Sequence, residues 1–163
     1  MSRIEVQHVQ QPTAHTCVHA CLSMVTALPV ESIMERFGNH GLDDETTVTV
    51  LSEMGIHPIN IPHIAGPLFI EGATYLASVP SLNNLGGAHA IIIEVGEIGD
   101  ATVYDPNEGR DGTQWYRRDA LHPTRDYTGP ILRRYTEALM LKSLRLHQGT
   151  RKRMLLYAAR KGE

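Results

Sequence analysis

The sequence predicts a single α+β domain in which N-terminal helices pack on a small antiparallel sheet. Up to about residue 55, apolar residues recur at three- and four-residue spacing between helix start and stop signals. From Thr74 onward the apolar runs are short and are separated by turn sequences, which is typical of strands. Helices followed by strands favour an α+β fold over alternating strand–helix units. The 163 residues, 42% of them apolar and 20% charged, suffice for one globular core.

Three helices are predicted in the first third of the chain. Thr16 is a plausible N-cap, and Val18, Cys21, Leu22 and Val25 place one apolar face on a helix from about Cys17 to Ala27. The second helix covers Val30 to Phe37 and ends at Gly38. The third begins after Asp43 or Asp44 and ends at Gly55.

The strands are predicted from alternation and from proline and glycine punctuation. Ala88–Val95 is the strongest of them, and a turn at 96–100 returns the chain into a strand at 101–105. The weaker ones are an edge strand at 56–61 beside Pro58 and Pro62, a strand at 74–79, a short strand at Trp115–Tyr116, and 134–141, where periodicity leaves strand and helix both open.

Charge divides the chain into an acidic body and a basic tail. Residues 1–141 hold 8 basic and 17 acidic residues, whereas residues 142–163 hold 7 and 1. We expect the tail to form a basic helix. Such a tail could meet nucleic acid, an anionic surface or an acidic partner, or it could be a solvated helix that folds against the acidic body.

The expected compartment is the cytoplasm. The N-terminus, Met1 to Glu5, has no apolar signal core, and no apolar run approaches the length of a membrane span. The two cysteines are four residues apart and cannot form a disulfide framework, so a reduced chain is expected. The sequence does not indicate an oligomeric state.

Cys17 is placed as a nucleophile would be. It opens an apolar helix, and the positive end of a helix lowers a thiol pKa and favours the reactive thiolate. Gln11 lies six residues earlier, and its amide could donate a hydrogen bond to the oxyanion that forms on attack. The alternative for an isolated cysteine is a small buried hydrophobe, which is our expectation for Cys21.

A base and its orienting group are predicted on the hairpin at 88–105. If Val95 faces Asp100 across the turn, His89 lies beside residue 106, and a register shift of one residue places it opposite Asp105. A histidine base needs an acceptor on its second ring nitrogen, and Asp105 on the adjacent strand would provide one. His89 and Asp105 are therefore predicted to be neighbours.

The close succession of His15, Cys17, His19 and Cys21 is compatible with a metal site. Zinc sites usually add a second, distant ligand pair, and residues two apart on a helix do not share a face. We therefore expect no metal and no organic cofactor. His15 and His19 could instead line a substrate groove.

Three short motifs together resemble the papain-like cysteine peptidases, most closely the C39 family and its free-standing bacterial and phage relatives. They are the glutamine, five residues and cysteine of Gln11–Cys17, the small-His-apolar context of Gly87–Ile91, and the apolar-x-Asp-Pro context of Val103–Pro106. They occur in the family's order and span roughly residues 6 to 110. One position departs from the pattern: the family commonly has Asp-Cys-Gly, whereas this chain has Val18 after the cysteine, which narrows the neighbouring groove.

The resemblance implies a papain-like domain over residues 1–141 that acts as a cysteine peptidase or related amide hydrolase on a peptide or protein. Cys17 would be the nucleophile, His89 the base and acid, Asp105 the orienting group and Gln11 the oxyanion donor. The substrate would be bound near four residues: Val18, His19, Gly87 and Ala88. Isopeptidase or acyltransferase chemistry stays open. The rival hypothesis is a catalytically degenerate binding module that engages a peptide, a partner protein or nucleic acid through its groove and basic tail.

Overall fold

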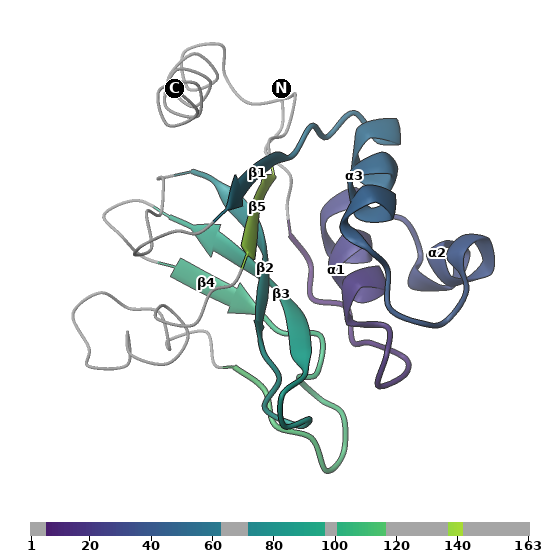
Figure 1. Ribbon diagram of the computed structural model, residues 1–163, viewed down its shortest axis with the longest axis vertical. Helices are drawn as coiled ribbons and strands as arrows, with labels where there is room; N and C mark the ends of the chain where they lie inside the picture. The colour runs from purple at the N-terminus through teal and green to yellow at the C-terminus, as the bar shows by residue number, and fades with distance from the viewer. Residues whose placement is uncertain (1–5, 63–71, 97–100, 117–136, 142–163) are drawn as a thin grey trace.

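The computed structural model describes residues 6–62, 72–96, 101–116 and 137–141. Over these residues the fold is α+β, as predicted, with the helices gathered on one side of an antiparallel sheet (Figure 1). The chain passes through the three helices first, and α1 contacts α2, α3 and strand β3. Helix α1 therefore joins the other two helices to the sheet.

The helix bounds agree closely with the sequence prediction: α1 is Cys17–Thr26, α2 is Val30–Phe37 and α3 is Asp44–Glu53. Asp43 caps α3 by accepting a 2.8 Å hydrogen bond from the Thr46 N–H. The predicted N-cap position of Thr16 is confirmed, although its side chain makes no capping hydrogen bond. Thr16 occupies the N-cap position of α1, but its hydroxyl donates to the Thr13 carbonyl and folds the preceding loop instead.

The sheet is built from β1 (Ile59–Pro62), β2 (Thr74–Pro80), β3 (Ala88–Val95), β4 (Ala101–Tyr104) and β5 (Glu137–Leu141). Its strand order is β1-β5-β2-β3-β4, and every pair is antiparallel. The proline-flanked β1 lies at one edge, as predicted. The ambiguous segment before residue 142 is a strand, β5, which is inserted between β1 and β2.

Helix α1 and strand β3 supply the centre of the core. Leu22 and Met24 from α1 pack in one cluster with Leu51 of α3, Leu76 of β2 and Ile92 of β3. Both faces of β3 are buried, since Ile91 and Ile93 are as inaccessible as Ile92. This explains why its sequence is a continuous apolar run rather than an alternation. The start of β3, which carries His89, is consequently held against a rigid core.

Two expectations for the later chain are corrected. Trp115–Tyr116 does not form a strand. In the 88–105 hairpin Val95 pairs with Ala101 rather than with Asp100, and Ile92 pairs with Tyr104, so the register differs by one residue from the one assumed. The paired part of β4 ends at Tyr104, because Asp105 and Pro106 leave the strand in a turn.

The basic tail predicted at 142–163 lies outside the described residues. Within the part of the chain that the structure describes, no helix is long and apolar enough to cross a membrane.

Candidate active site

The Cys17 thiol lies at the first residue of α1, where the helix meets the start of β3. The side chain is half-buried. The backbone N–H groups of Val18 and Ala90 both hydrogen-bond to its sulfur and lower its pKa. One of these donors belongs to the helix N-terminus and the other to β3. The sulfur therefore sits in the junction between the two elements, in a position that favours a negative charge.

His89 connects Cys17 to Asp105. Its Nε2 lies 2.7 Å from Oδ1 of Asp105, and the His89 and Asp105 side chains are 6% and 0% exposed. The same imidazole hydrogen-bonds to the Cys17 thiol. The structure thus brings together three of the residues singled out in the sequence, and the predicted proximity of His89 and Asp105 is confirmed despite the error in register.

The electrostatics of the cluster favour a thiolate beside an imidazolium. Burial raises the pKa of Cys17, but the hydrogen bond and the charge of His89 outweigh it, so that the pKa is lowered overall. Burial lowers the pKa of His89, yet hydrogen bonds and charges from Asp105 and Cys17 prevail and raise it to about 9. Both shifts increase the population of the nucleophilic form of Cys17 at neutral pH.

Asp105 is held by backbone donors on both carboxylate oxygens. Oδ1 accepts a 2.8 Å hydrogen bond from the Asn107 N–H, and Oδ2 accepts one of 2.8 Å from the Tyr116 N–H. The Asp105 carbonyl also accepts a 2.8 Å bond from Nε2 of His8. With His89 on Oδ1 as well, the buried carboxylate is paired on each oxygen and its orientation is fixed.

Gln11 is hydrogen-bonded through its backbone, and not through its side chain, to the loop that follows Asp105. Its backbone N–H donates a 2.9 Å bond to the Pro106 carbonyl, directly after Asp105. The side chain is 2% exposed, and its Nε2 donates a 2.7 Å bond to the Thr13 carbonyl. An amide nitrogen has two hydrogens, so one donor is left for an oxyanion. Its Oε1 has no hydrogen-bond partner among the described residues.

His19, expected to line a substrate groove, is wrongly assigned. It is fully buried, and its Nε2–H donates a 2.9 Å bond to the Gly38 carbonyl at the end of α2. Burial lowers its pKa, so the ring is neutral. It therefore joins α1 to α2, and a substrate cannot reach it.

The other residues expected at the substrate lie at the two elements that meet at Cys17. Val18 is half-buried and packs against the core, while Ala88 is exposed at the start of β3. The Gly87 N–H donates to the Asn84 carbonyl at 2.9 Å, and its own carbonyl accepts from the Ser81 N–H at 2.9 Å. Gly87 thus closes the β2–β3 turn, two residues before His89.

Cys21 is placed as expected, one helical turn after Cys17 and fully buried. Burial, with smaller contributions from the charges of Cys17 and Asp105, raises its pKa well above the usual range of a thiol. Cys21 is therefore an unreactive neighbour of Cys17. Within the described residues no group of three or more histidine, cysteine or acidic side chains is arranged to hold a metal ion.

Sequence reasoning missed three partners of Asp105: His8, Asn107 and the backbone of Tyr116. The contact with Asn107 could have been predicted from the sequence, because the carboxylate of an aspartate followed by proline commonly accepts a hydrogen bond from the backbone N–H two residues later. The contacts of His8 and Tyr116 with Asp105 had no such signal in the sequence. His8 is 97 positions away from its acceptor, and Tyr116 contributes only a main-chain N–H.

No protein-family model matches this chain, and a search of curated proteins finds no match.

Proposed function

We propose that the protein is a papain-like cysteine peptidase or related amide hydrolase of the C39 type, acting on a peptide or protein in the cytoplasm. The single observation that carries the proposal is the buried chain of contacts from Cys17 through His89 to Asp105. It supplies a nucleophile, a base and an orienting group in one connected network. The α+β arrangement, with the cysteine at a helix start and the histidine at a strand start, supports the papain-like assignment.

The proposed reaction begins with attack of the Cys17 thiolate on a carbonyl carbon. The resulting oxyanion accepts hydrogen bonds from the Cys17 N–H and from the remaining Nε2 hydrogen of Gln11. His89 then gives its proton to the leaving amine as the C–N bond breaks, which leaves an acyl group on Cys17. His89 next takes a proton from water, which attacks the thioester and releases the acid and the thiol. An amine in place of water would give acyl transfer or isopeptide chemistry.

Alkylation with iodoacetamide at mildly acidic pH tests the proposal, because only an activated cysteine reacts quickly there. We expect Cys17 to be labelled on the order of tenfold faster than a free thiol. The advantage should disappear in His89→Ala. Cys21 is the internal control, and mass spectrometry should find it unlabelled in the folded protein. Labelling of Cys17 at the rate of a free thiol would refute the activated-nucleophile proposal.

A second candidate is a binding module on the same scaffold, and the state of Gln11 favours it. One of the two hydrogens on the Gln11 amide nitrogen is already donated to the Thr13 carbonyl, and Val18 follows Cys17 where the C39 family commonly has a glycine. The discriminating measurement is cleavage of a peptide library read by mass spectrometry. Cleavage that requires Cys17 supports the enzyme, whereas saturable peptide binding without cleavage supports the module.

Nucleic-acid binding through residues 142–163 remains a prediction, since these residues lie outside the described part of the chain. It requires an affinity for nucleic acid that falls steeply with salt and that is lost when the basic residues of this segment are replaced. Salt-insensitive binding, or none, would refute it.

A further inference from the structure

The turn between β2 and β3 and the loop that follows β4 lie side by side (Figure 1). The turn, residues 81–87, leads into β3 and so to His89. The loop, residues 105–116, begins with Asp105, which receives the hydrogen bond of His89. A contact that joins the turn to the loop therefore also bears on the placement of the base relative to its orienting group.

Asn83 of the turn makes such a contact with the main chain of Gln114, 31 positions later. Its Nδ2 donates a 2.8 Å hydrogen bond to the Gln114 carbonyl, and its Oδ1 accepts one of 2.7 Å from the Gln114 N–H. One side-chain amide thus pairs with both main-chain groups of a single residue, as an opposing residue does in an antiparallel sheet. The two bonds fix the position and the direction of the loop at Gln114.

The backbone of Asn83 is itself held firmly relative to β3. The Ser81 hydroxyl accepts hydrogen bonds from the N–H groups of Asn83 and Asn84, at 3.2 and 3.0 Å. Two residues before Ser81, Val79 pairs with His89 in the sheet. Asn83 is therefore fixed with respect to the strand that carries His89.

The loop delivers a hydrogen-bond donor to Asp105 only two residues after Gln114. The Tyr116 N–H donates a 2.8 Å bond to Oδ2 of Asp105, whereas His89 and the Asn107 N–H occupy Oδ1. Two residues of extended chain span only about 6–7 Å, so a displacement at Gln114 is passed on to the Tyr116 N–H. In the described part of the chain, Oδ2 has no other donor.

We propose that Asn83 is a positioning residue for Asp105. By holding Gln114 against the turn, it keeps the Tyr116 N–H on Oδ2, and the carboxylate then directs Oδ1 at His89. Once this contact is lost, the loop can withdraw its donor and the carboxylate gains freedom to rotate. The inference rests on the proposed function, and it adds to that function an exposed residue that controls the orienting group from outside the site.

Amide hydrogen exchange at Tyr116, followed by NMR, tests the structural step and requires no catalysis. We expect exchange to be roughly three- to tenfold faster in Asn83→Ala than in the wild type, because the loss of a hydrogen-bonded contact makes local opening easier. Asn83 is exposed, so its truncation leaves no cavity and the fold should persist.

Iodoacetamide labelling of Cys17 at mildly acidic pH tests the consequence for the site. We expect Asn83→Ala to slow labelling roughly two- to fivefold. The difference should narrow above about pH 9, where a thiol ionises without an imidazolium beside it. When His89→Ala is already present, Asn83→Ala should have no further effect, because Asn83 acts through the base. Cys21 must stay unlabelled, which shows that each variant is folded.

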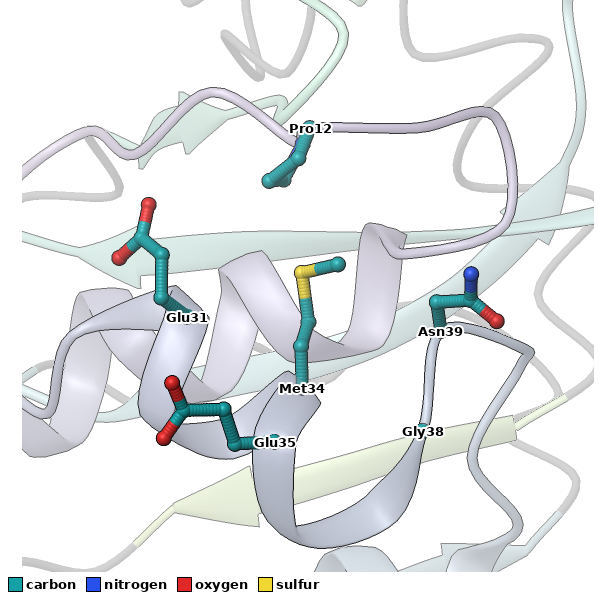
Figure 2. Close-up of a pocket in the computed structure, with 6 residues that line it drawn as sticks. All are labelled: Pro12, Glu31, Met34, Glu35, Gly38 and Asn39. Carbon is teal, nitrogen blue, oxygen red and sulfur yellow. The ribbon is translucent and has the colours of Figure 1, made fainter.

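Two control substitutions should retain the wild-type exchange and labelling rates. Asn39→Ala makes the same chemical change at an exposed asparagine beyond the end of α2, where Asn39 and Met34 line a pocket of about 460 Å³ beside Pro12 (Figure 2). Leu85→Ala removes a fully exposed side chain from the same turn as Asn83. Effects in either control as large as that of Asn83→Ala would argue against a specific contact.

An exchange rate at Tyr116 that is unchanged in Asn83→Ala would overturn the proposal. Faster exchange that leaves Cys17 labelling unaltered, or a labelling defect that persists equally in His89→Ala, would overturn it as well. Failure of the proposed function is recognised separately, since Cys17 of the wild type would then be labelled no faster than a free thiol. The exchange at Tyr116 would still decide whether Asn83 holds the loop.

Discussion

Nε2 of His89 lies 2.7 Å from Oδ1 of Asp105, with both side chains almost wholly removed from solvent. A histidine in such a position would lose its proton if burial acted alone. The carboxylate reverses this tendency, together with the Cys17 thiol on the other side of the ring. Asp105 therefore influences the charge state of Cys17 through His89, which hydrogen-bonds to both.

Replacement of Asp105 should lower the pKa of His89. In Cys17→Ala/Asp105→Asn we expect the imidazole to titrate below its value in Cys17→Ala, because the amide keeps an acceptor but removes the charge. NMR titration of the His89 ring measures the shift. An unchanged His89 titration would show that Asp105 does not control its protonation.

The contribution of His89 to the stability of the fold should decline as the pH rises from about 6.5 toward 9. The pKa of His89 is raised from 6.5 to about 9 in the folded protein, so its stabilising contribution is complete below pH 6.5 and is lost as the pH passes through 9. The lowered pKa of Cys17 acts in the opposite sense, since its contribution is lost as the pH falls.

The two contributions can be separated by removing the thiol. Urea unfolding of Cys17→Ser at a series of pH values isolates the His89–Asp105 pair. We expect the unfolding free energy to fall across this window in Cys17→Ser and to change less in Cys17→Ser/His89→Gln. Parallel profiles for the two variants would contradict the pairing of His89 with Asp105.

His8 should contribute to both stability and reactivity. Its ring donates to the Asp105 carbonyl, so His8→Ala is expected to cost about 1 kcal/mol in urea unfolding and to slow alkylation of Cys17. The matched variant is Gln10→Ala, which removes an exposed 3.3 Å bond to the Glu108 carbonyl and should cost less than about 0.5 kcal/mol. Equal effects from the two substitutions would argue against a specific role for His8.

Gly38 should not tolerate a side chain. Its φ is +86°, and an added Cβ would lie 2.8 Å from the His40 ring. We expect Gly38→Ala to lower the free energy of unfolding by about 1 kcal/mol or more. Gly41→Ala is the control, because nothing lies within 4 Å of a Cβ at that position and the variant should be close to neutral. Thermal unfolding measures both, and a neutral Gly38→Ala would refute the prediction.

Local signals predicted the helices well. Asp43 before α3 and Gly38 after α2 are capping residues whose effects depend on a few neighbours, and the observed bounds follow them. The residues Cys17, His89 and Asp105 could be identified because each occupies a recognisable local context, a helix start, a strand start and an Asp-Pro turn. Their convergence then follows from the antiparallel hairpin and from the contact between α1 and β3.

The features that escaped prediction depend on long-range packing. The burial of His19 is determined by where α2 ends relative to α1, which periodicity within α1 cannot reveal. The hairpin register was mistaken because it was inferred from the turn alone, whereas the paired region starts at Ala101 and stops at Tyr104. The sequence indicated Gln11 as an oxyanion donor, but it did not reveal that the side-chain amide donates one of its hydrogens to the Thr13 carbonyl in the same loop.

The hydrogen bond from His8 to the Asp105 carbonyl joins positions 97 residues apart. On a ribosome, Cys17 emerges long before the strand that carries His89 and the loop that holds Asp105. The thiol consequently behaves as an ordinary cysteine in the nascent chain and acquires its chemistry only when β3 and the Asp105 loop have docked. The alkylation rate of Cys17 therefore serves as a kinetic reporter of tertiary assembly, and it can be measured during refolding without knowledge of the substrate.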